Sequence, residues 1–207
     1  MQGKEWIAAK AAQMLDDGEL VNLGIGMPVK VADCIPPDKT VFLQSENGFI
    51  GIGPSPAPGQ EDPCLITAGG QYTTVLPGGS MFDSAVSFGL IRGGHVTTTV
   101  LGALEVDEEG NIANWIIPGK KMPGMGGSMD LLAGAKRVIV TMEHCNKNGE
   151  PKIRKKCTLP LTAEKKVHYI ITELCVIQVT EHGLHVLELA PGVTMEQVRQ
   201  KTEADLL

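Results

Sequence analysis

The run Thr40-Val41-Phe42-Leu43-Gln44-Ser45-Glu46-Asn47-Gly48 joins an apolar segment to an abrupt turn. The apolar part predicts a short buried strand, and Asn-Gly is typical of the turn that ends one. Glu46 therefore stands at the end of a strand, which is where functional sites gather in open α/β folds. Glutamate is rarely buried at a turn unless it is paired or used, so a reactive carboxylate and a solvated turn acid both remain possible.

Strands and helices alternate on both sides of this run. We expect strands over 20–23, 72–76, 95–101 and 137–142, and hairpins over 104–115 and 175–189. We expect helices over 7–15 and 29–35, after a capping box at Ser80 and Asp83, from Ser128, after Thr162, and after Thr194 with Gln197. Loops rich in glycine and proline are expected over 51–63 and 118–127. The pattern predicts one α/β domain spanning 1–207, with a mixed sheet covered by helices.

The bulk composition is that of a globular protein with an aliphatic core. The 207 residues are 43% hydrophobic but only 4% aromatic, and the mean hydropathy is +0.04. The formal net charge is -6, which argues against a nucleic-acid partner. One basic cluster, Lys152, Arg154, Lys155 and Lys156, fits either an exposed strand face or a phosphate contact.

The chain carries no sign of a membrane or an oxidising compartment. No apolar segment is long enough to cross a bilayer, and residues 1–17 lack the apolar core of a signal peptide. The five cysteines are odd in number, and none are at C-x-x-C spacing. We therefore expect reduced thiols and a cytoplasmic location, with no membrane partner.

Two glycine-rich turns are the other candidates for chemistry. Gly24-Ile25-Gly26 follows a strand but lacks the third glycine of a dinucleotide fingerprint, which leaves a turn whose amides could face an anionic or planar ligand. Gly124-Met125-Gly126-Gly127 precedes a helix, where free amides can stabilise an oxyanion. Tight packing or a mobile loop explains that second run equally well. No metal-binding spacing is present, since His144-Cys145 alone is not a site.

Several ordered motifs together resemble a known family. They are Asn22-Leu-Gly-Ile-Gly-Met-Pro28, Gln44-Ser-Glu-Asn-Gly48, Leu90-Ile-Arg-Gly-Gly-His95, Ala113-Asn-Trp115 with Pro118-Gly-Lys120, Gly124-Met-Gly-Gly127, Thr141-Met-Glu-His144 and Cys157-Thr-Leu-Pro-Leu-Thr162. Over nearly the whole chain they resemble the β subunit of family I 3-oxoacid CoA-transferases. Tyr72-Thr-Thr-Val-Leu-Pro77 and Leu101-Gly-Ala-Leu104 look most like the butyrate/acetate–acetoacetate type.

The resemblance implies a fold and a site. The fold is a three-layer α/β/α arrangement with a mixed, mainly parallel sheet. Glu46 is the implied nucleophile, and Gly127 with Gly126 forms the implied oxyanion site. Gly24, Gly26, Asn47 and Gly48 are the expected substrate- and CoA-binding residues. No metal and no permanently bound cofactor is expected, because coenzyme A is itself the substrate and part of a covalent intermediate.

The implied activity is transfer of CoA between a short-chain acyl-CoA or 3-oxoacyl-CoA and acetate, butyrate or acetoacetate. It proceeds by a ping-pong mechanism through a glutamyl-CoA thioester on Glu46. The implied partner is a homologous α subunit in an α2β2 assembly. Two alternatives stay open: an acyl-CoA hydrolase that uses the same glutamate, and a non-catalytic subunit that completes the site of another chain.

Overall fold

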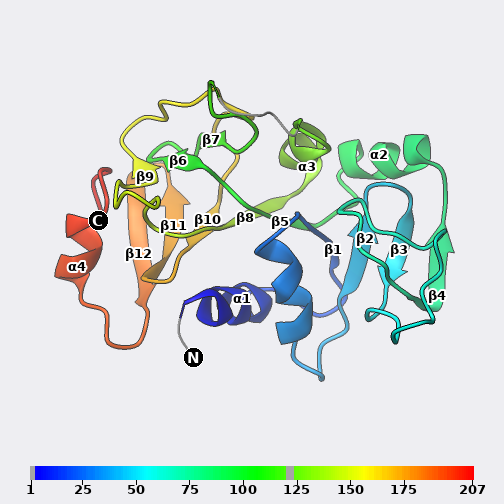
Figure 1. The fold of residues 1–207 in the computed structure, drawn as a ribbon. Helices are drawn as coiled ribbons and strands as arrows, with labels where there is room; N and C mark the ends of the chain where they lie inside the picture. The colour runs from blue at the N-terminus through cyan, green and yellow to red at the C-terminus, as the bar shows by residue number, and fades with distance from the viewer. Residues whose placement is uncertain (1–2, 120–123) are drawn as a thin grey trace.

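A nine-stranded sheet forms the centre of the computed structural model, which describes residues 3–119 and 124–207. The strand order is β12-β11-β10-β8-β5-β1-β2-β3-β4 (Figure 1). The bounds are β1 Leu20–Leu23, β2 Phe42–Ser45, β3 Phe49–Ile52, β4 Val75–Met81, β5 Thr98–Leu101, β8 Arg137–Thr141, β10 Tyr169–Ile171, β11 Cys175–Thr180 and β12 Gly183–Leu189.

The middle of this sheet is parallel and its margins are antiparallel. Strands β2, β1, β5, β8 and β10 pair in parallel, whereas β3 is antiparallel to β2 and β11 is antiparallel to β10. Because β4 and β12 reverse direction again, only β3 and β11 run against the rest. The predicted mixed, mainly parallel sheet is therefore confirmed.

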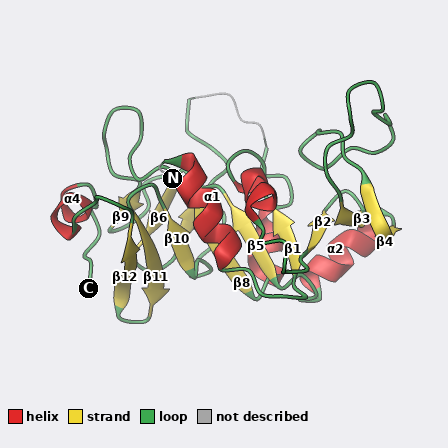
Figure 2. Cartoon of the chain, turned by 90° about the horizontal axis from the view of Figure 1, so that it is seen from below, coloured by secondary structure: helices red, strands yellow, loops and turns green. Residues whose placement is uncertain are grey.

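Helices cover both faces of the sheet, as predicted for a three-layer fold. Figure 1 shows α1 (Lys4–Gln13) and the 3-10 helix η1 (Pro28–Cys34) on one face, and α2 (Ser84–Arg92) and α3 (Ser128–Gly134) on the other. Helix α4 (Met195–Gln200) lies beside β12. From below, α1 lies against the middle strands, and β4 and β12 form the two edges (Figure 2).

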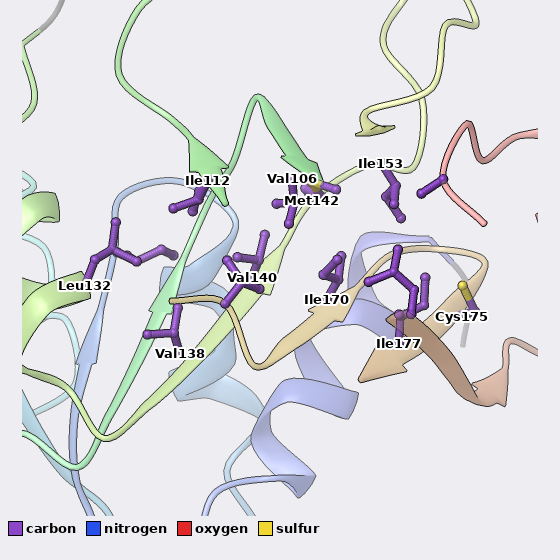
Figure 3. Close-up of a cluster of buried hydrophobic side chains, with 14 of the residues drawn as sticks. Val106, Ile112, Leu132, Val138, Val140, Met142, Ile153, Ile170, Cys175 and Ile177 are labelled. Atoms are coloured by element: carbon purple, nitrogen blue, oxygen red, sulfur yellow. The ribbon is translucent and has the colours of Figure 1, made fainter. Parts of the chain in front are cut away.

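A second, three-stranded sheet adds to the face that carries α3. Its order is β7-β6-β9, with bounds β6 Glu105–Asp107, β7 Ile112–Ala113 and β9 Ile153–Arg154. Val106, Ile112 and Ile153 project into one apolar cluster with Val138 and Val140 of β8 (Figure 3). The β6–β7 pair and the β11–β12 pair confirm the two predicted hairpins.

The parallel strands are buried on both faces, and alternate side chains serve different clusters. Val138 and Val140 join the cluster under α2, α3 and the small sheet, whereas Ile139 between them joins the cluster under α1. Residues Ile170 and Ile171 divide in the same way. This period of two is what a strand between two layers requires.

Two predicted helix starts differ from the structure. Ser80 lies in β4, and Asp83 itself is the N-cap of α2, accepting a hydrogen bond from Val86 N at 2.8 Å. No helix follows Thr162, because Ile170 and Ile171 must face opposite sides of the sheet. The capping box of Thr194 and Gln197 at α4 is confirmed.

The remaining differences are in the boundaries of elements. The strand expected over 72–76 runs from Val75 to Met81, and β3 occupies the start of the loop expected over 51–63. The predicted loop over 118–127 includes residues 120–123, which lie outside the described residues. All five cysteines are free thiols. Within residues 3–119 and 124–207, no helix combines the length and the apolarity needed to span a membrane.

Candidate active site

A cavity of about 1090 Å³ opens at the carboxyl ends of the parallel strands β1, β2 and β5. The chain leaves these strands at Gly24, Glu46 and Gly102, and all three residues line the cavity. The loop segment from Gly124 to Ser128 forms a further part of the wall. Parallel strands bring their carboxyl ends to one edge, so residues distant in the sequence meet here.

Glu46 is half-buried, and its carboxylate has a fixed neighbour. The Asn22 side-chain amide donates to Glu46 Oε2 at 3.2 Å. Asn22 is only 1% exposed, because it lies on β1 opposite Gln44 of β2, two residues before Glu46. One oxygen of the carboxylate is thus held by a buried donor.

The other carboxylate oxygen faces Gly127. A Cβ built on Gly127 would lie 3.3 Å from Glu46 Oε1, so the absence of a side chain permits this approach. Gly127 is the N-cap of α3, and no hydrogen bond from its N–H to another described residue is present. Gly126 also lines the cavity, with φ of +56°. The structure therefore brings together three of the predicted residues, Glu46, Gly126 and Gly127.

The turn at Gly24 and Gly26 lines the same cavity, but its amides are not equally available. The Gly24 N–H donates to Val100 O at 2.8 Å and so continues the strand ladder. A Cβ there would lie 3.0 Å from Leu101 Cδ2, which makes close packing the reason for glycine. Between the two glycines, Ile25 is 73% exposed.

Asn47 and Gly48 are not among the lining residues. The Asn47 amide donates to Ile66 O at 2.7 Å, outside the cavity wall. Gly48 has φ of +135°, and a Cβ there would lie 2.1 Å from Phe82 O. Both residues shape the β2–β3 turn that presents Glu46, and their role in binding stays a prediction.

Two asparagines of the wall were not singled out from the sequence. Asn22 begins a motif noted for its glycines, and its position at the end of a strand paired with β2 was the missed signal. Asn114 lines the cavity and donates to Gly102 O at 3.2 Å, while Thr162 Oγ1 donates to its Oδ1 at 2.7 Å. Asn114 thereby ties the wall at Gly102 to the segment before α3.

Comparison with known proteins places this geometry in a family. The family model described as Coenzyme A transferase matches residues 4–201. The chain belongs to the coenzyme A transferase family. It is 52% identical over 204 residues to the beta subunit of the acetate CoA-transferase of Escherichia coli strain K12, covering 99% of this chain and 93% of that protein.

Two further relatives of this CoA-transferase chain agree in extent. One subunit of a probable succinyl-CoA:3-ketoacid coenzyme A transferase of Bacillus subtilis is 52% identical, covering 99% of this chain and 94% of that one. The acyl-CoA transferase of Escherichia coli O157:H7, solved in a thioester complex with CoA, matches the fold with a TM-score of 0.76 at 23% identity. That match covers 100% of this chain and 42% of the other.

The rest of this CoA-transferase chain presents no second set of candidate ligands for a metal. Among the described residues, no three His, Cys, Asp or Glu side chains gather as a metal site would require. In the basic cluster, Arg154 pairs with Glu203 at 2.7 Å and Lys155 pairs with Asp205 at 3.0 Å. These pairs favour the exposed strand face over a phosphate contact.

The cavity of this CoA-transferase chain has a simple chemical capacity. It offers one carboxylate between an amide donor on one side and a glycine backbone on the other. Much of its wall is glycine and aliphatic side chains such as Leu101, Leu104 and Leu131. Such a wall excludes water from a reactive acyl intermediate.

Proposed function

We propose that this chain is the β subunit of a CoA-transferase in which Glu46 carries CoA as a glutamyl thioester. The observation that carries the proposal is the position of the Glu46 carboxylate, between Asn22 Nδ2 and Gly127 at the carboxyl ends of the parallel strands. Moving CoA from one acid to another is nearly isoenergetic. The reaction therefore needs a place to hold CoA while the acids exchange, and a carboxylate provides it by covalent catalysis.

In the first half-reaction, a Glu46 oxygen attacks the acyl-CoA carbonyl and expels CoA thiolate, which gives an acyl-glutamyl anhydride. The thiolate then attacks the Glu46 carbonyl of the anhydride. The first acid leaves as a carboxylate and takes the bridging oxygen with it. In the second half-reaction, the incoming carboxylate attacks the glutamyl thioester, and the same two steps run in reverse.

Each attack passes through a tetrahedral oxyanion. The proposal assigns the Gly127 N–H as a donor to it, with Gly126 shaping the turn. A preorganised donor of this kind is worth about 3 kcal/mol in a dry site. A carboxylate is a weak nucleophile, so remote contacts of the large CoA molecule must supply much of the remaining transition-state stabilisation.

The proposed substrates are a short-chain acyl-CoA or 3-oxoacyl-CoA and a carboxylic acid such as acetate, butyrate or acetoacetate. The relatives are named for acetate and for succinyl-CoA with a 3-ketoacid, which supports this class of acid. Both of those relatives are also named as one of the subunits of their enzyme, and the Escherichia coli protein is the beta one. We therefore propose a homologous α subunit as partner, in an α2β2 assembly that completes the acid and CoA pockets.

Trapping the covalent intermediate tests the proposal directly. The complex, purified with its partner subunit, is incubated with acetoacetyl-CoA, quenched in acid and digested. The peptide that contains Glu46 is then weighed. We expect an added mass corresponding to CoA on that peptide, and no adduct in the Glu46→Ala complex.

Other outcomes distinguish the alternatives. Transfer without an adduct on this chain, retained in Glu46→Ala, overturns the proposal and leaves the chain as a non-catalytic subunit. Release of free CoA without any acceptor acid, at the rate of transfer, identifies a hydrolase instead. Initial-rate lines that intersect when both substrates are varied also contradict the ping-pong mechanism.

A further inference from the structure

Three buried polar side chains lie behind Glu46 in a row. Asn22 Nδ2 donates to Gln44 Oε1 at 2.7 Å, and Gln44 Nε2 donates to Ser87 Oγ at 2.9 Å. Asn22 and Gln44 are each 1% exposed, and Ser87 is fully buried. Polar groups are costly to bury unless they are paired, so a row of three in an aliphatic core calls for an explanation.

The two ends of the Asn22 amide are treated very differently. Its Nδ2 has three acceptors within reach, namely Gln44 Oε1, Gln44 O at 3.3 Å and Glu46 Oε2 at 3.2 Å. Its buried Oδ1 has no hydrogen-bond partner among the described residues. An unpaired buried acceptor is unfavourable, so the contacts on the Nδ2 side must be what holds the amide in this orientation.

An amide nitrogen has only two hydrogens to share among those three acceptors. The shortest contact, with Gln44 Oε1, fixes one hydrogen and with it the plane of the amide. The second hydrogen is then directed toward Glu46. Gln44 presents Oε1 to Asn22 because its own Nε2 is bound by Ser87.

Helix α2 anchors this row and also contacts the opposite side of the site. Phe88, the residue after Ser87, has Cε1 at 3.4 Å from the position of a Cβ on Gly127. Arg92 of α2 pairs with Asp130 of α3 at 2.6 Å. One helix therefore holds both the Asn22 side and the Gly127 side of the Glu46 carboxylate.

We infer that Gln44 and Ser87 are positioning residues, which act through Asn22 to direct an N–H at Glu46 Oε2. The inference rests on the proposed role of Glu46. With Oε2 held, Oε1 on the Gly127 side is the oxygen that attacks the acyl-CoA carbonyl. Oε2 then remains as the carbonyl oxygen of the glutamyl thioester and keeps its donor through the cycle.

A double-mutant cycle tests this inference on the complex with its partner subunit. The rate of Glu46 adduct formation from acetoacetyl-CoA is measured for Gln44→Met and Ser87→Ala, each in the parent chain and in Asn22→Ala. Both substitutions keep approximate volume and remove the hydrogen bond. In the parent chain we expect losses of about 10- to 100-fold for Gln44→Met and about 5-fold for Ser87→Ala, with KM for acetoacetyl-CoA changed less than twofold.

The decisive readout is the second background. If Gln44 and Ser87 act through Asn22, then both substitutions cost less than twofold when Asn22 is already alanine. Equal fold-losses in both backgrounds show a merely structural role and overturn the inference. Ser84→Ala, on the exposed first turn of α2, is the matched control and keeps the parent rate.

The failure of the inference is distinguishable from failure of the proposed function. If the parent complex forms no adduct on Glu46, the proposed function fails first. If the parent complex forms the adduct and Gln44→Met forms it at the same rate, only the positioning role is wrong. Thermal unfolding of each variant identifies any that does not fold, and Gln44→Glu, which keeps an oxygen facing Asn22, then replaces Gln44→Met with retained coupling to Asn22 expected.

Discussion

A Cβ at Gly127 would lie 3.3 Å from Oε1 of Glu46, so these two residues approach as closely as a glycine allows. The φ of Gly127 is -81°, which alanine adopts readily. Gly127→Ala therefore tests the approach without straining the backbone. We expect the carboxylate to shift by tenths of an ångström and the transfer rate to fall about tenfold or more. Steady-state kinetics of the complex measure the loss.

The control for Gly127→Ala is Gly89→Ala. Gly89 lies inside α2, and a Cβ there meets nothing within 4 Å. We expect unchanged activity and a helix stabilised by up to about 1 kcal/mol. Equal turnover in Gly127→Ala and the parent chain would contradict the assignment of Gly127 to the site.

Shortening the nucleophile by one methylene provides a second prediction. In Glu46→Asp the carboxylate is withdrawn from both Asn22 Nδ2 and Gly127. We expect transfer to fall by at least about 100-fold from misplacement alone, with the fold intact. Glu181→Asp, at the exposed β11–β12 turn, is the matched control. Near-normal turnover in Glu46→Asp would remove Glu46 as the nucleophile.

The turn that presents Glu46 depends on Gly48. A Cβ there would lie 2.1 Å from Phe82 O, and φ is +135°. We expect Gly48→Ala to lower the free energy of unfolding by about 2–4 kcal/mol. Gly59 also has positive φ, at +83°, but a Cβ there meets nothing within 4 Å. Gly59→Ala should cost only about 1 kcal/mol, and denaturant unfolding of both variants separates the clash from the backbone strain.

Stability should fall in mild acid because of His144. Burial, with Lys201 and Lys152 nearby, lowers the pKa of His144 from 6.5 to about 4. The ring bonds to Thr172 Oγ1 at 2.9 Å and to Thr202 Oγ1 at 2.8 Å. Because the folded state favours the neutral ring, this contribution is complete above pH 6.5. It is lost as the pH falls from 6.5 toward 4, and amounts to at most about 3 kcal/mol.

Denaturant unfolding at several pH values between 4 and 7 measures this effect. The His144→Gln chain should lose less stability over that interval than the parent chain. If both chains lose the same free energy between pH 6.5 and pH 4, then His144 is not the group responsible.

The parts of the fold predicted correctly are those in which local pattern and packing agree. Val138, Ile139 and Val140 form a β-branched run that suits a strand buried on both faces. Thr194 and Gln197 satisfy each other within one turn, so no distant contact can alter that helix start. The helix expected after Thr162 was wrong because Val167, Ile170 and Ile171 at helical spacing also fit a strand that must supply two opposite layers.

The site was predictable only in part for the same reason. Glu46 and Gly127 were found through motifs, and the structure brings them together at one cavity. The contribution of Asn22 depends on the pairing of β1 with β2, which places it opposite Gln44. Periodicity along the chain carries no information on strand register. The Gly24 amide, for its part, is occupied by Val100 O, a pairing that local sequence does not reveal.

The order of the central strands has a consequence for how the reactive centre comes into being. Strands β8, β5, β1 and β2 are neighbours in the sheet but not in the chain, and each parallel pair needs a long connection to close. Loop-closure entropy must be overcome before such pairs form, so this topology folds slowly compared with one built from hairpins. Asn22 and Gly127 reach Glu46 only when several of these connections have closed. A newly made or partly unfolded chain therefore carries a harmless surface glutamate, and reactivity toward thioesters is a property of the finished fold alone.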